Sequence, residues 1–120
     1  MLGAGLALTL PRAARAAFPD KPLRIVLPVP PGAASDALAR SLAAHLQARL
    51  GQPVLVESKA GASGIIASDA VAKSAPDGST LLLSGNSIAI NPYLYRKLPF
   101  DTLRELVPVA LVAEPGPLVL

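Results

Sequence analysis

Short apolar runs alternate with longer helix-forming stretches between residues 23 and 83, and no other feature restricts the possible folds as strongly. The order is strand, helix, strand, helix, strand, and the links are short. Consecutive parallel strands need a crossover connection, which is usually a helix, so the alternation predicts an α/β fold. We expect a parallel-type sheet with helices on both faces.

The first strand and the first helix have the clearest boundaries. Residues 23–29 are almost continuously apolar, as in a strand buried on both faces, and Pro28 should end regular pairing because proline has no N–H. From Ser35 to Leu50 the apolar positions recur every four residues, which predicts a helix with one apolar face. Gly51 follows, where a left-handed C-terminal cap is expected.

The remaining elements have weaker signals. We expect strands at 53–57, 80–83 and 109–112, a second helix at 65–75 and a short helix near 102–106. After the third strand the sequence predicts a polar loop at 84–87, followed by Asn91 and Pro92 and then by a turn rich in Tyr and Leu.

Residues 1–16 have the features of a secretory signal peptide. An apolar run of ten residues is followed by Pro11 and then by small residues, which predicts cleavage after Ala16. The run is too short to span a membrane, which takes about 20 residues. No Lys or Arg precedes it, so an upstream start and an ordinary buried or frayed N-terminal segment stay open as alternatives. We expect residues 17–120 to be the N-terminal part of a ligand-binding α/β domain in a truncated chain.

Composition and charge exclude several classes of function. Without Arg12 and Arg15 of the leader, nine Lys and Arg stand against eight Asp and Glu, so the net charge falls from +3 to +1. No basic cluster remains of the kind that tracks a phosphate backbone, and nucleic acid is not an expected partner. The absence of cysteine excludes disulfides, a thiolate nucleophile and Cys-ligated zinc.

Three predicted loops, at 30–35, 58–64 and 84–87, consist mainly of small and hydroxyl residues. They follow three parallel strands, so they should emerge together at the carboxyl edge of the sheet, where ligands usually bind. The first loop leads into a helix, whose first N–H groups have no internal partners and attract an anionic group. We expect Ser35 to cap this helix, to donate to a ligand oxygen, or both.

Charged and polar side chains near these loops have two interpretations each. Asp36 either complements the positive end of the helix, or fixes the loop or meets an amino group of the ligand. Lys59 is either a positive charge near an anionic ligand or a solvated loop residue. Tyr93 and Tyr95 either shape a pocket mouth or belong to the partial core.

No catalytic motif is complete. The glycine-rich loop at 58–64 matches neither the dinucleotide fingerprint, nor the Walker loop, nor the hydrolase nucleophile elbow, and a plain flexible connection is its structural alternative. His45 follows Asp36 by nine residues, so the two point to nearly opposite sides of one helix. We therefore expect no triad, and an exposed position for His45.

Three segments together resemble a known family. FPDKPLRIVLPVPPGAASDALAR, LGQPVLVESKAGASGIIASDAVAKSAPDGSTLLL and INPYLYRKLPFDTLRELVPVALVA are similar to the tripartite tricarboxylate transporter substrate-binding proteins, also called Bug receptors, over residues 18–120. The resemblance implies a periplasmic binding protein-like (type II) fold whose two α/β domains close over a small carboxylate. The second domain is expected to be largely missing here.

The resemblance also implies site residues in the three loops. Carried over by motif, the expected ligand-binding residues are Pro31, Gly32, Ala33, Ser35, Asp36, Gly61, Ser63, Gly64, Ser84, Asn86 and Ser87. The family usually has a glycine pair where this chain has Gly32 and Ala33, so the backbone approach at Ala33 is less free.

The function that the resemblance implies is capture of a carboxylate-containing solute in the periplasm for the membrane permease of a tripartite transporter. We expect no enzymatic activity, no cofactor and no metal, and a monomer. Two alternatives stay open: an extracytoplasmic sensor that signals to a membrane kinase, and an α/β hydrolase-type enzyme. The enzyme needs a nucleophile with a base in reach, which this stretch does not offer.

Overall fold

The computed structural model describes residues 17–114, in which three parallel strands form a sheet of order β2-β1-β3. The strands are β1 (Leu23–Leu27), β2 (Val54–Ser58) and β3 (Thr80–Leu82). In the register, Leu23 is opposite Val54 and Arg24 is opposite Thr80. The first of the described strands, β1, is therefore the central strand of the sheet. The predicted leader, 1–16, and the end of the chain, 115–120, lie outside the described residues.

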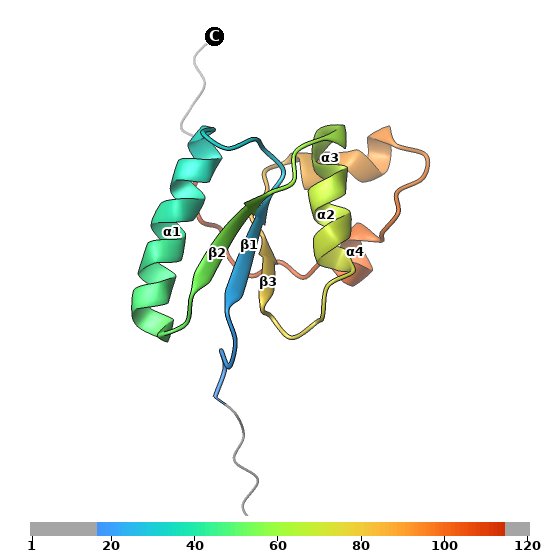
Figure 1. Cartoon of the computed structure of the whole chain (residues 1–120). Helices are drawn as coiled ribbons and strands as arrows, with labels where there is room; N and C mark the ends of the chain where they lie inside the picture. Colours follow the sequence, from blue (N-terminus) through green and yellow to red (C-terminus); the bar gives the residue numbers. More distant parts are fainter. Residues whose placement is uncertain (1–16, 115–120) are drawn as a thin grey trace, which may run out of the picture.

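Helices cover both faces of this sheet, as the strand–helix alternation predicts (Figure 1). Four α-helices and one 3-10 turn are described: α1 (Ala34–Leu50), η1 (Ala62–Gly64), α2 (Ile65–Ala72), α3 (Ser87–Leu94) and α4 (Thr102–Glu105). Helix α1 packs against β1 and β2, whereas α2 lies on the other face against β3 and β1. The α/β prediction with a parallel sheet is confirmed.

The core between α1 and the sheet combines large strand residues with small helix residues. Leu23, Ile25 and Leu27 alternate along β1 toward α1, and each is almost completely buried. They meet Ala39 and Ala43, whose small side chains let the helix approach the sheet closely. Burial of one such large apolar side chain contributes about 1.5–3 kcal/mol, so β1 is the main anchor of the described domain.

The predicted ends of the first strand and helix are confirmed. Strand β1 ends at Leu27, directly before Pro28. Helix α1 ends at a left-handed Gly51 with a φ of 68°, whose N–H donates to the carbonyl of Gln47 at 3.0 Å. Glycine adopts this conformation without a Cβ clash, so the sequence signal for the helix end has a direct physical basis.

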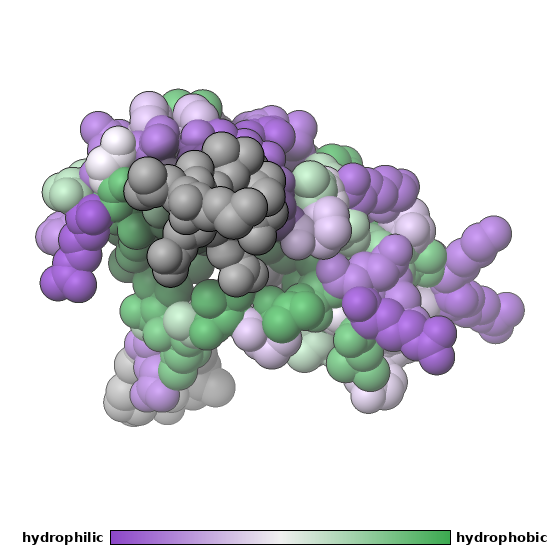
Figure 2. Space-filling view, turned by 90° about the horizontal axis from the view of Figure 1, so that it is seen from below, coloured by the Kyte–Doolittle hydropathy of each residue, from purple (hydrophilic) through white to green (hydrophobic). Residues whose placement is uncertain are grey.

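Two predictions in the C-terminal part of the chain are wrong. Residues 87–94 form helix α3, with Pro92 inside it, where a loop was predicted. Residues 109–112 form no strand, and Val109 and Leu111 are 80% and 75% exposed. A strand needs a partner, and no described strand pairs with this run. Apolar side chains also gather on the surface seen from below in Figure 2.

A turn stabilised by Asp77 precedes β3. One oxygen of the Asp77 carboxylate accepts the N–H of Ser79 at 2.9 Å and its hydroxyl at 2.6 Å, and the other oxygen pairs with Lys21. The Ser79 carbonyl in turn accepts the Arg24 N–H at 2.8 Å. The hydrogen bond from Lys21, followed by those from Ser79, holds the pKa of Asp77 well below its usual range.

We expect this turn to make the stability of the fold depend on pH in the acidic range. Because the pKa of Asp77 is lower in the folded chain than in the unfolded chain, its contribution is complete above the unfolded value of about 4 and is lost as the pH falls further. Asp77→Asn keeps an acceptor for Ser79 but removes the charge. The variant should melt a few degrees lower at pH 7, and the difference should shrink toward pH 3. A constant difference across this range would contradict the prediction.

Candidate functional site

The segments that follow β1, β2 and β3 meet at the carboxyl edge of the sheet, around Gly64. A Cβ added to Gly64 would lie 3.2 Å from the Cβ of Pro28 and 3.7 Å from the Oγ of Ser87. These neighbours belong to the loop after β1 and to the start of α3, whereas Gly64 follows β2. Segments that are far apart in the sequence therefore come into van der Waals range of one another.

The topology places a switch point at this edge. The chain leaves β1 toward α1 and enters β3 from α2, and these helices lie on opposite faces of the sheet (Figure 1). In open α/β sheets the crevice beside such a point, at the carboxyl ends of the strands, is the usual ligand position.

Asp36 fixes the loop after β1. Asp36 is 5% exposed. Its carboxylate Oδ2 accepts the N–H of Gly32 at 3.0 Å and the Nε–H of Arg40 at 3.1 Å. The Arg40 bond, followed by the Gly32 bond, lowers the pKa of Asp36 below its ordinary value. The second oxygen, Oδ1, is buried and has no hydrogen-bond partner among the described residues. This geometry fits the loop-fixing interpretation of Asp36, because neither oxygen is directed at open space.

The first turn of α1 leaves backbone donors free. The helix begins at Ala34 with Ala33 as its N-cap residue, so Ser35 lies inside the first turn and the prediction that it caps the helix is wrong. In the described part of the chain, the N–H groups of Ala34 and Ser35 have no hydrogen-bond partner. The N–H of Gly32, by contrast, is already bonded to Asp36. An anion at this helix end would therefore meet Ala34 and Ser35 first.

The loop after β2 has an unusual backbone. Ala62, Ser63 and Gly64 have φ values of 46°, 53° and 86°. The left-handed conformation costs about 1–2 kcal/mol for each residue that has a Cβ. Two side chains contact this turn, one from α3 and one from the residue that follows it. Asn91 Nδ2 donates to the Ser63 carbonyl at 2.9 Å, and the Tyr95 hydroxyl donates to Ser63 Oγ at 3.2 Å.

The charge of Lys59 is compensated. Its Nζ lies 2.8 Å from a carboxylate oxygen of Glu57, which also pairs with Arg24. The Arg24 bond, followed by the Lys59 bond, lowers the pKa of Glu57, so this carboxylate is ionised at neutral pH. Lys59 therefore offers less positive charge to an anion than its position in the loop implies.

The third loop leads into α3. Ser84 is half-buried, Asn86 is exposed and Ser87 is the first residue of the helix. Within residues 17–114 the N–H groups of Asn86 and Ser87 have no partner, so a second helix start with free donors lies at the same edge as the first.

The remaining candidate residues lie in or near these loops with different exposure. Pro31, Gly32, Gly61 and Ser63 are exposed, Ala33 is half-buried and Gly64 is buried. Tyr93 is 91% exposed and makes no contact with the loops that the structure records. His45 is exposed, as predicted, and its Nδ1 lies 2.7 Å from the Ser41 carbonyl.

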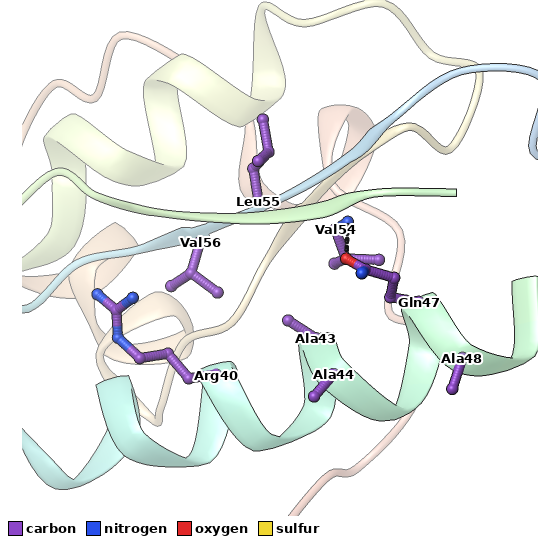
Figure 3. Close-up of a pocket in the computed structure, with 8 residues that line it drawn as sticks. All are labelled: Arg40, Ala43, Ala44, Gln47, Ala48, Val54, Leu55 and Val56. Carbon is purple, nitrogen blue, oxygen red and sulfur yellow. Dashed lines mark hydrogen bonds between the residues drawn. The ribbon is translucent and has the colours of Figure 1, made fainter. Parts of the chain in front are cut away.

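An open groove lies elsewhere, between α1 and β2 (Figure 3). Its lining residues are Arg40, Ala43, Ala44, Gln47, Ala48, Val54, Leu55 and Val56. Across it, the Val54 N–H donates to Gln47 Oε1 at 3.4 Å. None of the candidate site residues lines this groove, and its lining is mostly aliphatic.

Two kinds of feature are absent from the described residues. No group of three His, Asp or Glu side chains there is placed to hold a metal ion. No helix in residues 17–114 is both long enough and apolar enough to cross a membrane.

Comparison with known proteins identifies the family of the chain. The model of the tripartite tricarboxylate transporter family receptor matches residues 38–120, which is most of the chain. The chain belongs to this family. The chain is 49% identical over 105 residues to protein BugT of Bordetella pertussis. This match covers 86% of this chain and 32% of that protein.

Solved structures of similar proteins share the fold. The periplasmic binding protein BugD superposes with a TM-score of 0.69 at 35% identity, covering 73% of this chain and 29% of that one. MatC from Rhodopseudomonas palustris, solved with bound malate, superposes with a TM-score of 0.67 at 35% identity, covering 79% and 33%. The resemblance to the Bug receptors and the periplasmic binding protein-like fold are thus confirmed. Proteins of this family are receptors and not enzymes. The chain spans about a third of the length of the relatives that it matches.

Proposed function

We propose that the protein is a periplasmic receptor that captures a small carboxylate-containing solute for a tripartite tricarboxylate-type transporter. The observation that carries this proposal is that two helix starts with unpaired N–H groups lie at the carboxyl edge of the sheet. The free groups are those of Ala34 and Ser35 at the start of α1 and of Asn86 and Ser87 at the start of α3. Free donors at a helix N-terminus, together with the helix dipole, favour a negatively charged group.

The electrostatics of the site agree with an anionic ligand. Glu57 is neutralised by its two cationic partners. Asp36 is turned toward Gly32 and Arg40, so that its charge is compensated and its oxygens are occupied or buried. No side chain caps α1, so the Ser35 hydroxyl lies beside the free N–H groups of this helix as a further donor. Ser35 is therefore our candidate for a direct contact with a ligand oxygen.

The family supports the class of ligand and the partner. A related structure was solved with malate, a dicarboxylate, and the family is named for a tripartite tricarboxylate transporter. We accordingly propose the permease of such a transporter as the partner, the periplasm as the compartment and residues 1–16 as the export signal. A cleft closed by a second domain would bury the ligand more completely than one open edge does.

A thermal-shift screen of the complete protein tests this proposal. Malate, adipate, citrate, acidic amino acids and aromatic carboxylates are added in turn, and the melting temperature is measured. A ligand that binds only the folded state stabilises it by about 2.7 kcal/mol at a hundred times its Kd, so a binding carboxylate should raise the melting temperature clearly. Calorimetry then gives the Kd.

Ser35→Ala should weaken binding of that carboxylate about tenfold to a hundredfold, the usual effect of one lost hydrogen bond to a charged group. Ser41→Ala, a serine of the same helix on its exposed surface, is the matched control and should bind normally. The proposal fails if no carboxylate shifts the melting temperature of a protein that circular dichroism shows to be folded.

A further inference from the structure

Two side chains outside the candidate ligand-binding set hold the loop after β2, one in α3 and one directly after this helix. Asn91 Nδ2 donates to the Ser63 carbonyl at 2.9 Å, across 28 positions of sequence. The Tyr95 hydroxyl donates to the Oγ of the same serine at 3.2 Å. Asn91 is 4% exposed, so its bond is shielded from competition with water.

This loop depends on outside support. Ala62 and Ser63 are the only residues with a side chain that have a positive φ in the described chain, and they are consecutive. Few local hydrogen bonds hold this loop. The Gly64 N–H donates to the Gly61 carbonyl at 3.0 Å, and the Ile65 N–H donates to the Ala62 carbonyl. A strained backbone of this kind persists when surrounding groups hold it. Two buried side chains from other elements do so: Asn91 of α3 holds the Ser63 carbonyl, and the Ser68 hydroxyl of α2 donates to the Gly64 carbonyl at 2.9 Å.

The position of the loop connects this support to the site. The N–H groups of Ala62 and Ser63 have no partner within residues 17–114, like those at the starts of α1 and α3. Gly64, the next residue, is the point at which the three loops meet. Whatever fixes the Ser63 carbonyl therefore also fixes where these two donors lie relative to the other loops.

We propose that Asn91, assisted by Tyr95, is a positioning residue for ligand binding. By holding Ser63 in its left-handed conformation, Asn91 keeps the free N–H groups of the second loop at a fixed position relative to those at the start of α3, to which Asn91 belongs. The second and third loops then form one rigid half of the site. This inference rests on the proposed receptor function.

Hydrogen exchange and calorimetry on the complete protein test the inference together. Asn91→Ala should speed amide exchange in a peptide covering 59–66 about tenfold or more and leave α1 unchanged. It should also weaken binding of malate, or of the carboxylate that the screen returns, about tenfold. Tyr95→Phe should change both quantities in the same direction but less, because Tyr95 is partly exposed. Tyr93→Phe, the same substitution at a 91% exposed position two residues earlier, should change neither.

The outcomes separate three cases. Faster loop exchange with unchanged affinity would overturn the positioning role and leave the receptor function intact, as would equal binding by the Tyr95→Phe and Tyr93→Phe variants. A wild-type protein that binds no carboxylate would overturn the proposed function, and the inference with it, before any variant is compared. If the Asn91→Ala variant does not fold, the comparison of loop exchange and carboxylate affinity between the Tyr95→Phe and Tyr93→Phe variants decides whether the positioning role holds.

Discussion

Gly64→Ala should destabilise the chain by about 1–3 kcal/mol and weaken carboxylate binding by an order of magnitude or more. Alanine in the left-handed conformation that Gly64 adopts is strained, and its Cβ would lie 3.2 Å from the Cβ of Pro28, closer than an ordinary contact. Relief of either problem moves the loop away from Pro28 and Ser87. The binding loss should therefore exceed what the stability loss alone explains. Urea unfolding and calorimetry measure the two effects.

Gly85→Ala is the matched control for this substitution. A Cβ at Gly85 meets nothing within 4 Å, and its φ lies outside the left-handed range. The stability of this variant should stay within about 0.5 kcal/mol of the wild type. Equal stability of the Gly64 and Gly85 variants would show that the close meeting of the three loops does not exist in solution.

Leu27→Ala should cost about 3 kcal/mol, within the range of 2–5 kcal/mol for buried leucines. Leu27 is completely buried and ends the central strand, and its carbonyl accepts the Lys59 N–H at 2.8 Å. The cavity would form directly below the loop after β1. Leu55→Ala provides the comparison, because Leu55 lies on the edge strand β2 and is 56% exposed.

The Leu55 variant should lose less than about 1 kcal/mol, since a half-exposed side chain has less apolar area to lose. Similar shifts of the urea midpoint for the two leucine variants would contradict the central position of β1. A shift for Leu55 larger than that for Leu27 would contradict the strand order itself.

Local patterns in the sequence were sufficient for the first part of the fold. The strands and helices from Leu23 to Leu82 follow from apolar periodicity and from Gly and Pro at their ends, and each lies within a few residues of its predicted place. Helix α3 was missed because Pro92 is an unfavourable residue for a helix interior. Its hydrogen bonds to Ser63 come from another part of the chain, and no local pattern contains them.

The candidate site was predictable at the level of loops but not of donors. The alternation of elements places three small-residue loops at one edge, and the structure brings them together. The sequence could not show that the Asp36 carboxylate accepts the Gly32 N–H, or that Ser35 lies two positions after the N-cap residue of α1. Asn91 lies in one of the segments that resemble the family, but nothing in the local sequence indicated its bond to Ser63. Which of the candidate residues contact a ligand stays a prediction.

The central place of β1 has a consequence for how the chain folds. Its partners come late: β2 begins about 30 residues after it and β3 more than 50 residues after it, and it has no neighbouring hairpin. Every pairing of the sheet must close a long loop before it gains any contact, and that entropy cost slows folding. A nascent chain that ends before residue 80 cannot complete the sheet. The protein is therefore expected to stay unfolded for longer than a helical bundle of the same size.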